Sequence, residues 1–226
     1  MKKLFFIALF AFSLIPAFSQ QSEVRQIGSF RGVKAGEAID VYLRKGDKEQ
    51  VKVEVTGTAL SNILTEVSGT YLRIHMKEGS YRNRTVKVYV TYVNLEKISA
   101  SSAANIFSEN IITSTDMEIS ASSAASVEVS LDTQSLAVDA SSAGTITLEG
   151  KAKKISIEAS SAGNIDAYNL EGDNVSVSAS SGGGAKVTVH KEFQAEASSG
   201  GTIRYRGTPT KTNTDSSSGG SVKKSN

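Results

Sequence analysis

A seven-residue phrase of small residues returns throughout the second half of the chain and constrains the fold more than any other feature. It reads ASSAGTI from Ala140, and its copies begin at Ala100, Ala121, Ala159, Ala179, Ala197 and, in a degraded form, Ser216. Successive copies start 21, 19, 19, 20, 18 and 19 residues apart. A period of this length is typical of a solenoid, in which each repeat is one coil that buries its apolar side only against its neighbours.

The residues around each copy alternate between apolar and polar. Two residues before the phrase, the intact repeats carry an apolar residue: Ile98, Ile119, Val138, Ile157, Val177 and Ala195. One residue before it they carry a polar residue: Ser99, Ser120, Asp139, Glu158, Ser178 and Glu196. Alternation is the period of a β-strand, and stacked coils place equivalent residues ~4.8 Å apart in a parallel sheet. We therefore predict an all-β fold, a parallel β-helix of about 19–20 residues per coil.

The phrase itself is interpreted as a tight corner of the coil. The corner interior would admit only Ala at the first position and Ala or Gly at the fourth and fifth positions. We expect the second serine of each pair, such as Ser142, to face inward and to hydrogen-bond along its own column. The competing hypothesis is a serine nucleophile, but the phrase supplies no base beside it.

Three segments are predicted along the chain. Residues 1–19 have the basic start MKK, a short apolar run and the small-x-small site Ala17-Phe18-Ser19, which are typical of a signal peptide. Residues 20–97 contain less regular alternating stretches such as AIDVYLRKGD, which we expect to start the solenoid or to pair as a small antiparallel cap. Residues 98–226 hold the β-helix repeats, and their last coil is a polar cap in which Thr212 and Thr214 replace apolar residues.

Composition limits the partners and the chemistry. The chain has 25 Lys and Arg, 23 Asp and Glu, and no Cys. Residues 98–226 carry 10 basic and 14 acidic residues, so we do not expect nucleic acid as a partner. The lack of cysteine excludes disulfides, thiolate metal sites and a lipid-modified cysteine. No segment after residue 19 approaches the ~20 apolar residues of a membrane-spanning helix, so none is predicted in the mature chain.

Several stretches of the chain resemble a known bacterial family. They are FRGVKAGEAIDVYLRKG, VEVTGTALSNILTEVSGTYLRIHM and VYVTYVNLEKISASSAANI, followed by the serine-glycine coils, and they cover most of the mature chain. Together they resemble the auto-transporter adhesins with a head GIN domain, whose members commonly have Gly-Ser-Gly at the corner. The resemblance implies an exported, envelope-associated β-helical protein of the kind common in bacteria related to Bacteroides. It implies no catalytic residues and no cofactor.

The sequence offers little for catalysis. The only histidines are His75 and His190, and the alternation around each predicts that it faces solvent. There is no GxSxG motif, and Gly182-Gly183-Gly184 is not followed by the Lys-Ser/Thr of a phosphate loop. The enzyme alternative is a polysaccharide lyase or hydrolase on a β-helix. Such sites need clustered carboxylates, or a basic residue beside calcium, in loops longer than these coils provide.

One polar column stands out as a candidate site for a cation or for sugar hydroxyls. It contains Asp139, Glu158, Glu196 and Asp215, interrupted by Ser178. Carboxylates in a ladder repel one another unless a cation or a basic group lies between them. The alternative interpretation is an ordinary solvated strand face on which the side chains splay apart.

These observations together predict an exported binding module. We expect a non-enzymatic adhesion protein that presents extended sheet faces to a glycan or to a protein of the cell envelope. Its expected location is the periplasm, the outer membrane surface or the extracellular space. The alternative function is a polysaccharide-active enzyme on the same scaffold.

Overall fold

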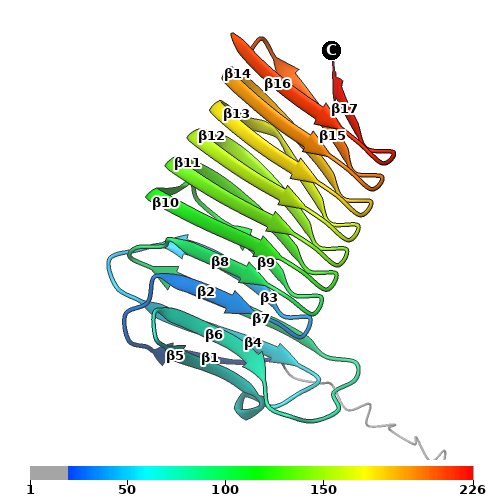
Figure 1. Ribbon diagram of the computed structural model, residues 1–226. Coiled ribbons are helices and arrows are strands. Elements are labelled where there is room, and N and C mark those ends of the chain that lie inside the picture. The colour runs from blue at the N-terminus through cyan, green and yellow to red at the C-terminus, as the bar shows by residue number, and fades with distance from the viewer. Residues whose placement is uncertain (1–19, 226) are drawn as a thin grey trace, which may run out of the picture.

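The chain folds into a parallel β-helix built from one continuous sheet of 17 strands (Figure 1). The computed structural model describes residues 20–225, and the predicted signal peptide at residues 1–19 lies outside them. Within that range the one helical element is a single 3₁₀ turn at Leu60–Asn62. The predicted all-β fold and its parallel coils are therefore confirmed.

The central coils are long strands that pair in parallel with the next coil. They are β10 (Ile112–Ala121), β11 (Ser126–Ala140), β12 (Thr145–Ala159), β13 (Asn164–Ala179) and β14 (Gly184–Ala197). Their register brings Ile119, Val138, Ile157, Val177 and Ala195 side by side, each one repeat after the last. All five are buried. The alternation in the sequence thus becomes a ladder of apolar side chains along the axis of the coil.

Each coil has two sides, which we call the front face and the back face. The front face consists of β6 (Tyr71–Met76), β2 (Gly32–Ala35), β8 (Lys97–Ala100), β10, the second halves of β11 to β14, and β16 (Lys211–Ser216). The back face consists of β7 (Thr85–Tyr92), β3 (Asp40–Lys45), β9 (Asn105–Ser108), the first halves of β11 to β14, β15 (Thr202–Gly207) and β17 (Ser221–Lys224). The buried side chains of both faces form one core between them.

The repeated phrase forms a β-turn between the two faces. In the coil that begins at Ala140, the amide of Gly144 donates to the carbonyl of Ser141 at 2.8 Å. Ser142 and Ala143 have φ values of 48° and 62°, so both central residues are left-handed, as a type I′ turn requires. Ala140 and Gly144 are buried, while Ser142 and Ala143 are exposed.

The expected inward orientation of the second serines is therefore wrong. In every intact copy this serine has a positive φ and lies at the exposed tip of the turn: Ser102, Ser123, Ser142, Ser161, Ser181 and Ser199. The first and fifth positions of the phrase are buried and require small residues, whereas the fourth position, also predicted to face inward, is exposed. The side chains of two consecutive residues in the left-handed conformation point outward, and strand parity alone does not predict this.

The turns are stacked through their own backbone groups. The amide of Ser160 donates to the carbonyl of Ala140 at 2.9 Å, and the amide of Ala143 donates to the carbonyl of Ser161 at 3.1 Å. The sheet hydrogen bonds thus continue around the corner from one face to the other.

The upstream strands both begin the solenoid and form an antiparallel layer at its end. β2 pairs in parallel with β6 and β8, and β3 pairs in parallel with β7 and β9. β1 (Gln21–Gln26) and β4 (Gln50–Thr56) extend the sheet from β7 in antiparallel fashion, and β5 (Ile63–Ser68) pairs antiparallel with β6. This region therefore contains both parallel and antiparallel strand pairs.

An earlier copy of the turn, which the sequence pattern did not predict, follows β2. Ala35 lies in register with Ala100, and the following Glu37 and Ala38 have φ values of 62° and 55°. This copy reads AGEAIDV and departs from the small-residue pattern at two places, Glu37 at the tip and Ile39 at the fifth position.

Candidate binding face

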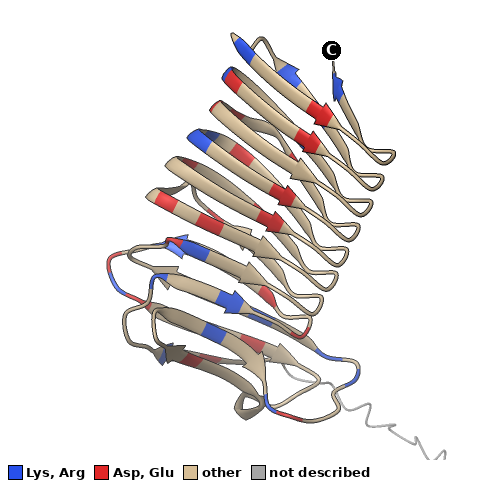
Figure 2. Cartoon of the chain, in the orientation of Figure 1, with Lys and Arg blue, Asp and Glu red and all other residues tan. Residues whose placement is uncertain are grey.

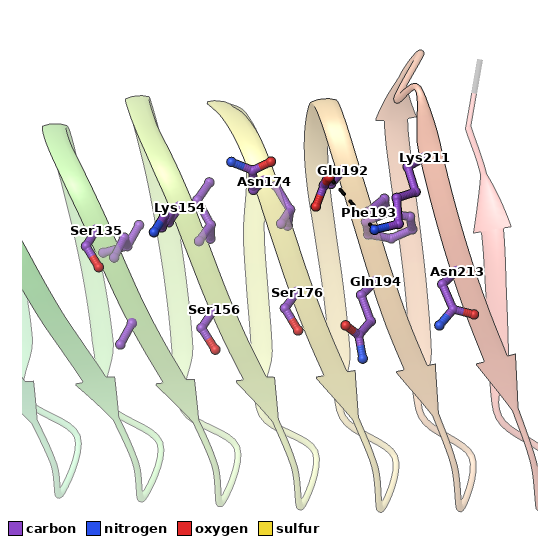
Figure 3. A pocket seen from close by; sticks show the side chains of 14 residues that line it. Ser135, Lys154, Ser156, Asn174, Ser176, Glu192, Phe193, Gln194, Lys211 and Asn213 are labelled. Atoms are coloured by element: carbon purple, nitrogen blue, oxygen red, sulfur yellow. Dashed lines mark ion pairs between the residues drawn. The ribbon is translucent and has the colours of Figure 1, made fainter.

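A groove runs along the front face, across the strands, in the C-terminal half of the coil. It has a volume of about 430 Å³ and crosses β11, β12, β13, β14 and β16 (Figure 3). One row of outward side chains along it consists of Ser135, Lys154, Asn174, Glu192 and Lys211. The second row consists of Ala137, Ser156, Ser176, Gln194 and Asn213. The five strands are neighbours, so the groove is roughly 19 Å long, four strand spacings of ~4.8 Å.

The pleat of the sheet creates this groove. Residues of the two rows are two positions apart in each strand, and the residue between them points inward. Phe193 is one of these inward residues and is only 2% exposed, so it gives the floor no aromatic platform. The floor is backbone and apolar surface, and the walls are polar side chains, both short ones such as Ser156 and longer ones such as Lys154 and Glu192.

The groove offers groups that both donate and accept hydrogen bonds. Asn174, Gln194 and Asn213 contribute amides, and the serines contribute hydroxyls. Its one carboxylate belongs to Glu192, which forms an ion pair with Lys211 at 3.9 Å (Figure 3). This combination suits sugar hydroxyls, and it lacks the two carboxylates that glycoside hydrolysis uses.

The predicted acidic column lies on the same face, beside the turns. Asp139 and Glu158 are direct neighbours in register, Ser178 follows, and Glu196 and Asp215 are neighbours beyond it. Figure 2 shows the acidic segments near the ends of β11, β12, β14 and β16. Partial burial, and then the charge of Glu158, raise the pKa of Asp139.

The column forms two pairs of carboxylates rather than one cluster. Within residues 20–225, no three His, Cys, Asp or Glu side chains are grouped so that they could hold a metal ion. Contact of this column with a cation or a sugar stays a prediction.

The two histidines differ from each other in their surroundings. His190 is exposed, as predicted, and pairs with the carboxylate of Glu171. His75 was expected to face solvent but is half-buried, because β5 pairs with its strand and places Leu64 opposite it. Its Nδ1 lies 3.1 Å from the carbonyl of Met76. In the described part of the chain neither ring has a serine as its hydrogen-bond partner.

Aromatic side chains form a ladder on the back face that the sequence analysis did not identify. The Tyr42 ring stacks on Tyr89, with centroids 5.1 Å apart, and on Phe107, with centroids 5.4 Å apart. The Lys52 ammonium lies 5.6 Å from the centroid of Tyr89. These rings cover one another's faces and leave mainly their edges for a ligand, so we interpret the ladder as cross-strand packing.

Comparisons with solved structures show the same fold in other proteins. A "putative adhesin" from Bacteroides fragilis NCTC 9343 is 21% identical, with a TM-score of 0.83, and the match covers 92% of this chain and 98% of that one. A "putative lipid binding protein" from Parabacteroides distasonis ATCC 8503 is 18% identical, with a TM-score of 0.73 and coverage of 92% and 97%. A "putative adhesin" from Parabacteroides merdae ATCC 43184 is 18% identical, with a TM-score of 0.69 and coverage of 92% and 96%. At these identities the likeness extends to the fold alone.

Residues 20–225 contain no helix with the length and apolar character needed to cross a membrane. No curated protein matches the chain. Residues 29–209, most of its length, match the family described as "Putative auto-transporter adhesin, head GIN domain", and the chain therefore belongs to that family.

Proposed function

We propose that this chain is an exported, non-enzymatic binding module that holds a glycan along its front face. The observation that carries the proposal is the open groove of about 430 Å³, walled by amides and hydroxyls from five neighbouring strands. Sugars expose many hydroxyls that donate and accept at once, and short amide and hydroxyl side chains can satisfy both roles.

A rigid sheet is well suited to this task. The groove residues lie on regular strands of a continuous ladder, so little order has to be gained when a ligand binds. The acidic column beside the groove would add carboxylate acceptors for the same ligand. Export is supported by the signal-like sequence of residues 1–19 and by the family to which the chain belongs.

The proposal is tested by a glycan array followed by calorimetric titration with the best ligand. Replacing Asn174 and Gln194 together by Ala removes two amides from the groove. We expect about a tenfold or greater loss of affinity, because each hydrogen bond contributes roughly 0.5–1.5 kcal/mol. Asn164→Ala, at an exposed position of the back face, is the matched control and should bind as the wild type does.

Two results would overturn the proposal. One is glycan binding that is unchanged in the Asn174/Gln194 variant, which would move the site elsewhere. The other is release of new reducing ends or unsaturated products from the bound glycan, which would show an enzyme. Cell fractionation of the full chain and of a version without residues 1–19 tests export separately.

A further inference from the structure

We infer that a recess in the N-terminal half of the front face takes an anionic substituent of a sugar, a carboxylate or a phosphate. The recess has a volume of about 590 Å³ and is lined from β5, β6, β2, β8 and β10. The inference rests on the proposed function, because it assumes that the ligand on this face is a glycan. It adds the chemical class of the ligand and the place where its charge is bound.

A glycine shapes the recess. Gly32 in β2 lies between Tyr71 in β6 and Lys97 in β8 on the adjacent strands. A β-carbon at Gly32 would lie 2.6 Å from Cδ1 of Tyr71 and 3.2 Å from Cβ of Lys97. The tyrosine ring therefore leans into the space that a side chain would fill. The ring and the lysine form one wall, and the ring is half-buried, which leaves part of it open to a ligand.

Two cations in the recess form no ion pair with any of the described residues. Lys34 and Arg73 are direct neighbours in register on β2 and β6, and both are exposed. Glu66 stands opposite Arg73 in the antiparallel β5–β6 pair without forming an ion pair with it. Among the described residues neither cation takes part in an ion pair. Like charges on adjacent strands repel each other, so an anion placed between them would relieve an unfavourable contact.

The third cation and the one carboxylate of the recess neutralise each other. Lys97 binds Glu118 at 2.9 Å, and this hydrogen bond, with the Glu118 charge, raises the pKa of Lys97. The carboxylate of Glu118 is thereby occupied. The net charge presented to a ligand comes from Lys34 and Arg73.

Serine hydroxyls complete the recess. Ser99 lies in register with Lys34 on one side and with Ser120 on the other. Ser120 donates its hydroxyl hydrogen to Ser99 Oγ at 3.0 Å, so the hydrogen of Ser99 is free to donate to a ligand. The recess thus has hydroxyl donors beside two cations, the kinds of group that bind a carboxylate or a phosphate.

The outward column of side chains that contains Lys34 and Ser99 is basic at one end of the front face and acidic further along it. From β6 onward the column runs Arg73, Lys34, Ser99, Ser120, Asp139 and Glu158. Figure 2 shows basic segments on β2, β6 and β8 and acidic segments further along the coil. An anionic substituent is attracted to the recess and repelled by the far end of the face. A glycan with one charged end would therefore bind in one direction.

The test uses three monosaccharides that share a ring and differ in charge: glucose, glucuronate and glucose 6-phosphate. Each is titrated into the isotopically labelled mature chain at low salt, and backbone amide shifts are followed by NMR. We expect saturable shifts at Lys34, Arg73 and Ser99 with one or both anions and none there with glucose. Comparison of the two anions tells carboxylate from phosphate.

Variants make the test specific. Replacing Lys34 and Arg73 together by Gln should weaken anion binding about tenfold or more. It should leave the melting temperature the same or higher, because a repulsive pair is removed. Lys153→Gln, at an exposed lysine of β12 outside the recess, is the matched control and should bind as the wild type does.

The outcomes separate this inference from the proposed function. The inference is overturned if neither anion shifts the amides of the recess, or if the Lys34/Arg73 variant binds the anion with full affinity. In either case, a neutral glycan bound in the Asn174/Gln194 groove would still support the proposed function. Anion binding at the recess supports the inference even if glycan binding is unchanged in the Asn174/Gln194 variant. Unchanged glycan binding in that variant counts only against the groove as the glycan site.

Discussion

A β-carbon on Gly163 would lie 2.1 Å from the carbonyl oxygen of Ala140 in the preceding coil. That carbonyl is already the acceptor for the amide of Ser160, at 2.9 Å. Stacking of the coils thus brings the inside of each turn against the backbone of its neighbour. Small residues recur there because one backbone rests directly on another.

The two coils with Ala at this position show how the turn adjusts. The hydrogen bond that closes the turn is 3.1 Å long at Ala104 and Ala125 and 2.7 Å long at Gly163. The turn is thus wider where a β-carbon is present.

We predict that Gly163→Ala destabilises the protein by roughly 1–3 kcal/mol, since the turn must open against its neighbours. The adjacent Ala162→Gly should have the opposite effect. Ala162 has a φ of 62°, and relief of its left-handed strain should contribute about 0.5–1 kcal/mol after the entropic cost of glycine. Urea denaturation of the two variants measures both changes, and equal signs would contradict this account of the turn.

The turn-tip serine is predicted to be dispensable for stability. Ser142 is exposed, and its hydroxyl has no hydrogen-bond partner among the described residues. We expect Ser142→Ala to change the free energy of unfolding by less than about 0.5 kcal/mol. A loss above about 1 kcal/mol would instead favour a serine ladder inside the coil.

The ionised carboxylate of Asp139, in the acidic column, should lower the stability of the fold in a pH-dependent way. Its pKa is raised by partial burial and by Glu158, so the folded state binds the proton more tightly than the unfolded state does. Ionisation of Asp139 therefore opposes folding at neutral pH. This loss of stability disappears when the pH falls below 3.8, the usual pKa of aspartate.

We predict that Asp139→Asn raises the melting temperature at neutral pH and that the gain is lost in acid. The control is Asp132→Asn, which removes an ion pair with Lys151 at 3.2 Å and should give no gain. Thermal unfolding across this pH range makes the comparison. A lower melting temperature for Asp139→Asn at neutral pH would show that the carboxylate has a stabilising partner.

A buried tyrosine should control part of the alkaline unfolding. Tyr92 is 2% exposed, its hydroxyl has no hydrogen-bond partner within residues 20–225, and burial raises its pKa from 10.0 to about 12. The folded state thus favours the protonated phenol. The stability that this preference contributes is lost as the pH rises from 10 toward 12.

Tyr92→Phe should be at least as stable as the wild type at neutral pH, because it removes a buried hydroxyl without a partner. It should also unfold at a higher pH. An absorbance titration of the phenolates should lose its most alkaline component in this variant. Identical titration curves for the two proteins would count against the enclosed hydroxyl.

The fold was predictable because the alternation of apolar and polar residues is kept in every coil before the polar last one. The apolar residues Ile119, Val138 and Ile157 indicate both the strand period and the register. Their nearly constant spacing indicates that the strands are parallel. Local geometry was less predictable. The orientation of Ser142 depends on two left-handed residues in succession, and parity carries no information about them.

The candidate sites depend on what the coil brings together. Lys34 and Arg73 are 39 residues apart and become neighbours only through the pairing of β2 with β6. The groove amides Asn174 and Gln194 could have been found by extending the column analysis from the position before the phrase to the positions three and five residues before it. The acidic column was visible in the sequence because its members share one position of the repeat.

The central claim is that equivalent residues lie directly over one another, with no room for a larger side chain where the turn begins. Ala140 is 0% exposed and lies in register between Ala121 and Ala159. Equilibrium denaturation of Ala140→Leu tests the claim most directly, and we predict a loss of about 1–3 kcal/mol from overpacking. Stability equal to that of the wild type would contradict it.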